Sequence, residues 1–168
     1  FIEALKAANM PFTDEAIAEL VKKKDDVQTG LTKTVNLFGG ARDLLNSLYT
    51  RKKMALASMS SRKVIDRLLY EKEVKKYFDV VITADEISYP KPNPDIFLKC
   101  ATKLRCHSEK CIVVEDSIFG VKAAKEARMK CIAIPSGAYS RKELEKEHPD
   151  LIVDSIKEKD KILNLMLT

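Results

Sequence analysis

The chain has 168 residues, of which 45% are hydrophobic, so it is long enough to bury one core of ordinary domain size. No apolar stretch approaches the roughly 20 residues that a membrane helix needs, and no membrane partner is expected. The net charge of +5 suits an anionic small-molecule substrate but is also common in ordinary soluble proteins.

The lysine clusters and the cysteines narrow the class of protein further. Lys22–Lys24 and Arg51–Lys53 contain no interleaved aromatic residues, so we expect solvated surfaces and no nucleic-acid partner. The four cysteines form no C-x-x-C pair, and the two histidines do not complete a zinc site. We therefore expect reduced thiols and a cytoplasmic protein. No signal peptide opens the sequence, and the absence of an initiator Met suggests part of a longer protein.

The first 36 residues are predicted to be helical. The apolar spacing predicts one helix over Phe1–Met10 and a second that begins at Thr13 or Asp14 and breaks near Gly30. The second helix should carry Ile17, Leu20 and Val21 on one face.

From Ala41 onward, predicted helices and strands alternate. Helices are predicted over Ala41–Tyr49, Ser61–Tyr70, Pro94–Leu104, Ile118–Ala127, Arg141–Glu147 and Lys159–Met166. Strands are predicted over Lys53–Ala57, Phe78–Thr83, Ile112–Glu115, Lys130–Ile134 and Leu151–Val153. This alternation indicates an α/β protein with a Rossmann-like, doubly wound parallel sheet.

The strongest chemical signal is the apolar run Cys111–Val114, which breaks into the adjacent carboxylates of Glu115 and Asp116. Ligands of open α/β sheets bind at the carboxyl ends of the strands. Two adjacent acids there need a positive partner, and Mg²⁺ is suitable because it prefers oxygen ligands and accompanies phosphate. We therefore predict that Asp116 and Glu115 hold Mg²⁺.

A second signal follows the strand that ends at Ala57. Ser58, Ser60 and Ser61 stand just before a predicted helix, whose free N–H groups and dipole could bind a phosphate. Serines at this position also cap helices, so a purely structural role remains open.

Lys91 lies among Pro90, Pro92 and Pro94, which restrict the backbone on both sides. A lysine held in this way can balance carboxylates and phosphoryl oxygens as a compact charge. The alternative is a stiff turn that opens the next helix, with the lysine in solvent.

The order of these three signals resembles the haloacid dehalogenase-like (HAD) superfamily of phosphatases and phosphomutases. Leu56-Ala57-Ser58 is similar to its second motif, Lys91-Pro92 to its third, and Val113-Val114-Glu115-Asp116-Ser117 to its fourth. The segments Lys91–Phe97 and Glu115–Ala124 are similar to the β-phosphoglucomutase-like branch. The resemblance runs from about residue 15 to residue 155.

This resemblance implies roles for individual residues. Ser58 would hydrogen-bond the transferring phosphoryl group, Lys91 would neutralise its charge, and Asp116 would ligate Mg²⁺. Glu115 would be a further ligand or would support Asp116.

The same resemblance divides the chain into a partial helical cap over residues 1–36 and an α/β core over residues 37–168. Ser60, Ser61 and Arg62 would lie near the phosphate or sugar end of the substrate. Lys23 and Lys24 would face the substrate from the cap, although an exposed helical face explains them equally well.

The sequence departs from the family at its first motif, a strand ending in Asp-x-Asp that supplies the nucleophile. Asp25-Asp26 is no substitute because it follows a charged helical run. By resemblance, the absent strand would lie in the middle of the sheet, between the strands ending at Ser58 and Glu115. We therefore expect the chain alone to be inactive, with the nucleophile on an N-terminal segment or on a complementing chain.

The sequence thus predicts a Mg²⁺-dependent phosphatase of a small phosphorylated metabolite, such as a sugar phosphate, acting through an aspartyl-phosphate. A phosphomutase of the β-phosphoglucomutase type uses the same chemistry and is the alternative. A catalytically inactive binding module with the same fold is an alternative of another class.

Overall fold

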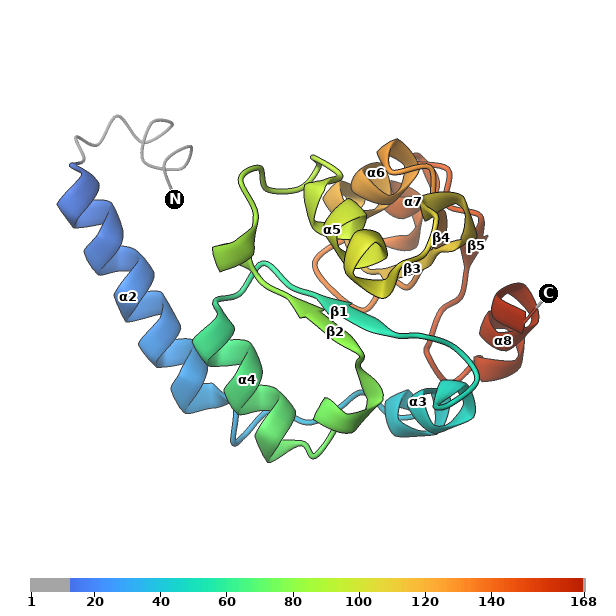
Figure 1. Cartoon of the computed structure of the whole chain (residues 1–168), viewed down its shortest axis with the longest axis horizontal. Helices are drawn as coiled ribbons and strands as arrows, with labels where there is room; N and C mark the ends of the chain where they lie inside the picture. The colour runs from blue at the N-terminus through green and yellow to red at the C-terminus, as the bar shows by residue number, and fades with distance from the viewer. Residues whose placement is uncertain (1–12, 168) are drawn as a thin grey trace.

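The computed structural model describes residues 13–167 as helices on both sides of short parallel strands (Figure 1). The α-helices are α2 (Asp14–Leu31), α3 (Ala41–Leu48), α4 (Arg62–Glu71), α5 (Asp95–Leu104), α6 (Ile118–Glu126), α7 (Arg141–Glu145) and α8 (Lys159–Leu167). Short 3₁₀ turns are η1 (Lys75–Tyr77), η2 (Ala84–Glu86) and η3 (Ser108–Lys110). None of the helices described is long and apolar enough to cross a membrane.

The strands form two separate parallel sheets within residues 13–167. Strand β1 (Ala55–Ala57) pairs with β2 (Val80–Ile82), and β3 (Ile112–Glu115) pairs with β4 (Lys130–Ala133), which pairs with β5 (Leu151–Ile152). The described residues contain no ladder between β1 and β3. The prediction of a parallel α/β fold is confirmed, with the sheet divided between the strands that lead to Ser58 and Asp116.

Alternate strand residues pack on opposite sides, as a parallel sheet covered on both faces requires. On one side, Ala55, Ala57 and Ile82 share a core with helices α5 and α6. On the other, Leu56 and Val81 pack with α4, while Ile132 packs with α3 and α8. These layers leave the carboxyl ends of β1 and β3 facing a common space.

The order of elements follows the prediction, and the differences lie at element ends. The strand predicted from Lys53 begins at Ala55, because the Met54 amide donates to the Asp79 carboxylate at 2.8 Å instead of to a ladder. Helix α2 ends at Leu31, one residue after Gly30, so the predicted break near Gly30 is confirmed. The helix predicted over Phe1–Met10 lies outside the described residues.

Helix α2 contacts the core through α4, and none of its residues is fully buried. The Thr13 side chain caps it by accepting from the Ala16 amide at 3.2 Å. Asp26 pairs with Lys63 of α4 at 2.9 Å, so polar contacts join the two helices.

Candidate active site

The carboxyl ends of β1 and β3 open into one cavity of about 1000 Å³. Ser58, Lys91, Glu115 and Asp116 all line it. Three segments that are far apart in the sequence therefore meet in one place, which is the arrangement that a phosphate site at a sheet's carboxyl edge requires.

Glu115, the last residue of β3, is held on several sides. One carboxylate oxygen pairs with the Lys91 ammonium, and the other accepts from the Ser117 amide at 3.3 Å and the Ser117 hydroxyl at 3.1 Å. The Glu115 side chain is 8% exposed and that of Lys91 is 12% exposed. A Cβ at position 120 would lie 2.0 Å from the Glu115 Cδ atom, so Gly120 leaves room for the carboxylate.

Asp116 is exposed to the cavity and takes part in none of the ion pairs within residues 13–167. Partial burial, and then the neighbouring charge of Glu115, raise the pKa of Asp116 above its ordinary value. A Cβ at position 137 would lie 2.3 Å from Asp116 Oδ2, so Gly137 leaves room for this carboxylate. The ionised Asp116 therefore gains from a cation at this position.

Lys91 reaches the site from the proline-rich turn before α5. Its ammonium lies 5.1 Å from the centroid of the Phe97 ring, in addition to its pairing with Glu115. The lysine is thus placed by a carboxylate and an aromatic face, and the alternative of a solvated Lys91 is wrong.

The loop after β1 brings Ser58 to the cavity. The Ser58 amide donates to the Ile82 carbonyl at 3.0 Å, and its hydroxyl oxygen accepts from the Ser60 amide at 3.1 Å. Ser61 stands at the N-cap of α4, but its hydroxyl makes no capping bond, and its oxygen is buried without a partner within the described residues. Helix capping by Ser61 therefore does not explain the serines of this loop.

The remaining predicted residues do not line the cavity. The Arg62 guanidinium is turned toward Glu86 and the Val81 carbonyl. On α2, Lys23 pairs with Glu19 at 2.9 Å and Lys24 lies 3.7 Å from Asp25. Their contact with a substrate stays a prediction.

The donor set fits Mg²⁺ only in part. Within residues 13–167, no group of three or more His, Cys, Asp or Glu side chains is placed to hold a metal ion. Mg²⁺ is commonly bound by one or two carboxylates together with water and substrate phosphate. Asp116, with Glu115 beside it, meets that lower requirement.

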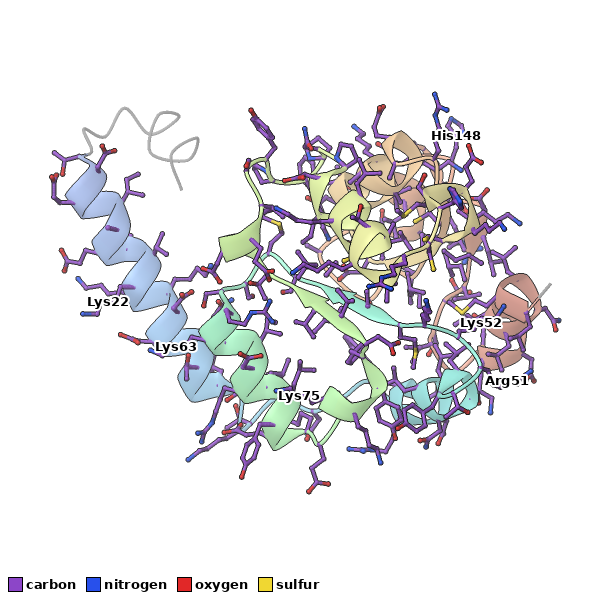
Figure 2. All side chains as sticks on the ribbon, in the orientation of Figure 1. Lys22, Arg51, Lys52, Lys63, Lys75 and His148 are labelled. Atoms are coloured by element: carbon purple, nitrogen blue, oxygen red, sulfur yellow. The ribbon has the colours of Figure 1, made fainter. Side chains whose placement is uncertain are left out.

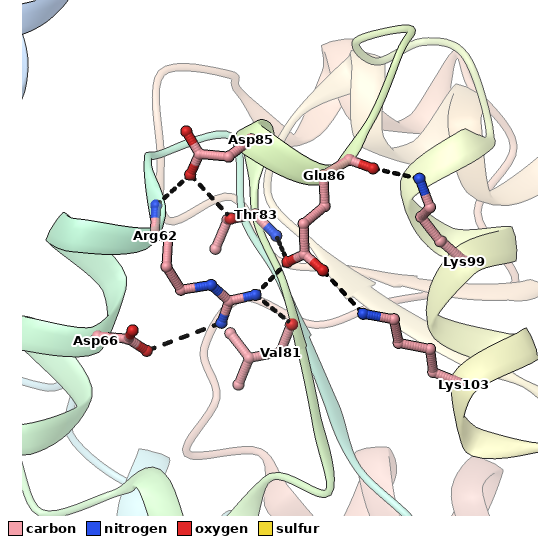
Figure 3. Close-up of polar contacts among 8 residues, drawn as sticks. All are labelled: Arg62, Asp66, Val81, Thr83, Asp85, Glu86, Lys99 and Lys103. Carbon is pink, nitrogen blue, oxygen red and sulfur yellow. Dashed lines mark hydrogen bonds and ion pairs between the residues drawn. The ribbon is translucent and has the colours of Figure 1, made fainter.

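The sequence did not indicate the role of the turn after β2, which contacts Arg62 (Figure 3) and whose Ala84 amide donates to the Ser60 carbonyl. Thr83 and Glu86 form a capping box there, and Asp85 accepts from the Arg62 amide. The spacing Thr-x-x-Glu is a known helix-start signal and could have identified the turn, although not its contact with Arg62.

The two basic clusters, Lys22–Lys24 and Arg51–Lys53, lie on different segments. Figure 2 shows Lys22 and Lys63 beside α2 and α4, whereas Arg51 and Lys52 lie at the opposite end, near α3 and α8.

A parallel α/β core with a serine, a lysine and paired acids around one cavity is typical of proteins that bind phosphate. Comparison with known families identifies the family to which the chain belongs. Residues 2–134 match the family model described as haloacid dehalogenase-like hydrolase, and the chain belongs to this family.

Two similar proteins are named as phosphatases. The chain is 46% identical over 84 residues to a bifunctional riboflavin kinase/FMN phosphatase of Arabidopsis thaliana, covering 49% of this chain and 22% of that protein. It is 35% identical over 92 residues to the fructose-1-phosphate phosphatase YqaB of Escherichia coli (strain K12), covering 55% of this chain and 49% of that protein.

A solved structure supports the fold. CbbY from Rhodobacter sphaeroides, in complex with xylulose-(1,5)bisphosphate, superposes with a TM-score of 0.77 at 28% identity, covering 88% of this chain and 68% of that chain. The chain spans half or less of the length of the two phosphatases.

Proposed function

We propose that this protein is a Mg²⁺-dependent phosphatase of a small phosphorylated metabolite, with a sugar phosphate as the first choice. The observation that carries the proposal is the convergence of Ser58, Lys91 and Asp116 on one cavity. The relatives named for fructose-1-phosphate and FMN phosphatase activity support a small phosphate monoester as the substrate.

In this proposal, Ser58 donates a hydrogen bond to the transferring phosphoryl group from the end of β1. The Lys91 ammonium balances the negative charge of the phosphoryl oxygens while Glu115 fixes its position. Asp116 would ligate Mg²⁺, with Glu115 adjacent, and the ion when bound would neutralise charge on the phosphate. Ser60 and Ser61, with Lys23 and Lys24 of α2, are the proposed contacts for the rest of the substrate.

The nucleophile is proposed to be a carboxylate outside residues 13–167. The division of the sheet supports this, because β1 and β3 flank the cavity without pairing to each other. Strands β1 and β3 have backbone edges that could pair with an additional parallel strand. Such a strand would end beside Ser58 and Asp116, where an aspartyl-phosphate could form.

The test is phosphate release from a panel of sugar phosphates and FMN by the protein as it is encoded, with and without Mg²⁺. We expect Mg²⁺-dependent turnover that Asp116→Asn abolishes and that Asp160→Asn, at the exposed start of α8, leaves unchanged. Undiminished turnover of Asp116→Asn would refute the assignment. Phosphate binding without turnover on any substrate would favour the inactive binding module.

A phosphomutase is the second candidate. A putative β-phosphoglucomutase from Thermotoga maritima superposes with a TM-score of 0.72 at 25% identity. Incubation with β-glucose 1-phosphate separates the two, since a mutase yields glucose 6-phosphate and a phosphatase yields glucose and inorganic phosphate.

A further inference from the structure

The loop that carries Ser58 is held by the segment that follows the neighbouring strand. At its start, the Ser58 amide donates to the Ile82 carbonyl at 3.0 Å. Two residues later, the Ser60 carbonyl accepts from the Ala84 amide at 3.2 Å. These two backbone hydrogen bonds therefore fix the conformation of the loop after β1 against the end of β2 and the turn that follows it.

The same turn supplies the anion at the start of α4. Asp85 Oδ2 accepts from the Arg62 amide at 2.5 Å, and the fully buried Thr83 hydroxyl donates to the same oxygen at 3.2 Å. A carboxylate at a helix N-terminus satisfies a free amide and interacts favourably with the helix dipole. The Ser61 hydroxyl at the N-cap makes no capping bond, so Asp85 caps the start of α4 from another segment.

The Arg62 side chain joins the two segments a second time (Figure 3). Its Nη2 atom donates to the Val81 carbonyl at 2.8 Å and pairs with Glu86 Oε1. Glu86 is itself fixed, since it accepts from the Thr83 amide at 3.3 Å and from Lys103 of α5 at 2.8 Å. The guanidinium is therefore bound to β2 and the turn after it.

We propose that Arg62 and Glu86 act as positioning residues that hold the Ser58–Ser61 loop in the geometry that binds phosphate. This inference rests on the proposed function, and it gives Arg62 a different role from direct contact with the substrate. Of this loop, Ser58 and Met59 line the cavity, while Arg62 Nη2 is engaged by Val81 and Glu86 and Arg62 Nη1 lies 3.8 Å from Asp66.

The consequence for activity follows from how steeply catalysis depends on placement. Displacing a reacting or binding group by about 1 Å can cost about a hundredfold in rate. Without the Arg62–Glu86 pair, the Asp85 contact and the Ala84–Ser60 bond remain, so we expect the protein to fold. Because one of the contacts that fix the loop is lost, we expect the Ser58 hydroxyl to be displaced and kcat/KM to be about 10- to 100-fold lower.

The experiment is a double-mutant cycle with Arg62→Gln and Glu86→Gln in the protein as it is encoded. The readouts are kcat and KM on p-nitrophenyl phosphate with Mg²⁺, the inhibition constant of inorganic phosphate, and the thermal midpoint. Arg67→Gln is the matched control for Arg62, because Arg67 lies on the same helix and pairs with Glu71. Asp150→Asn is the control for Glu86, because the Asp150 carboxylate also accepts hydrogen bonds from a backbone amide, that of Cys131 in β4, and from a lysine, Lys125.

We expect each single variant and the double variant to lose kcat/KM and phosphate affinity to a similar extent, because the two residues act as one unit. The two controls should lower the thermal midpoint without changing phosphate affinity. If Arg62→Gln does not fold, the kcat/KM and phosphate affinity of the isosteric Glu86→Gln variant alone test the inference. Lower thermal midpoints with unchanged phosphate affinity would overturn the inference and leave the proposed function intact, whereas a wild-type protein without phosphate binding or turnover would overturn both.

Discussion

Gly120, in the first turn of α6, is the position where one methyl group tests the architecture of the site. An alanine in a helix normally stabilises a protein by about 0.5–1 kcal/mol relative to glycine. At position 120, the added Cβ would lie 2.0 Å from Glu115 Cδ and 2.2 Å from Oε2. Since such contacts do not occur between real atoms, the Glu115 carboxylate must move.

The cost of that movement can be worked from the contacts of Glu115. The displaced carboxylate loses Lys91 and the bonds from Ser117, and its side chain is only 8% exposed. Breaking a buried ion pair costs about 3–5 kcal/mol. After the helix-propensity gain of about 1 kcal/mol is subtracted, Gly120→Ala should lose about 2–4 kcal/mol of the free energy of unfolding.

Gly30→Ala is the matched control, because Gly30 is also helical and a Cβ there meets nothing within 4 Å. Urea unfolding followed by circular dichroism should show this control slightly more stable than the wild type. The expected order of stability is Gly30→Ala, then wild type, then Gly120→Ala. If Gly120→Ala gains stability as the control does, Lys91 and Ser117 do not fix the Glu115 carboxylate.

Three further predictions concern the other acids. Asp116→Asn should unfold at higher urea concentration than the wild type at pH 7, because a carboxyl whose folded pKa is raised destabilises the fold once it ionises, and equal midpoints would contradict this. Gly137→Ala should weaken Mg²⁺ affinity in isothermal titration calorimetry by displacing Asp116, with a stability change within about 0.5 kcal/mol, and unchanged affinity would refute the contact. The ion pair with Lys103, and then the bonds from Thr83 and Arg62, lower the pKa of Glu86 to about 2. This contribution to stability is complete above pH 4.5 and is lost as the pH falls toward 2, so acid unfolding of Glu86→Gln should show a smaller pH dependence in this window.

The sequence predicted the order of helices and strands because apolar periodicity is a local property. The prediction failed at the start of β1, which depends on a residue distant in the sequence. Met54 was assigned to a strand, yet its amide bonds to the Asp79 side chain, which no pattern around Met54 reveals. The end of α2, by contrast, has a local signal, because Gly30 predicts a break and the helix ends one residue later, at Leu31.

The site was predictable to the extent that its residues sit in motifs. Ser58, Lys91 and Asp116 each follow a strand end or a turn signal, and the fold brings them to one cavity. The roles of Asp85 and Glu86 could not be predicted, because their contacts with Arg62 depend on the pairing of β1 with β2. The room that Gly137 leaves for Asp116 likewise depends on a contact between residues far apart in sequence, which only the folded chain creates.

The two adjacent acids also divide their roles for a geometric reason. Successive side chains at a strand end point to different sides, so Glu115 turns toward Lys91 and Gly120 of α6 while Asp116 turns toward Gly137. Glu115 has its charge compensated by the protein itself, whereas Asp116 pairs with no lysine or arginine of the described residues. The fixed negative charge of Glu115 makes ionisation of Asp116 more costly unless a cation binds. The pair therefore comprises one carboxylate that the protein holds in place and one that is free to take the proposed Mg²⁺.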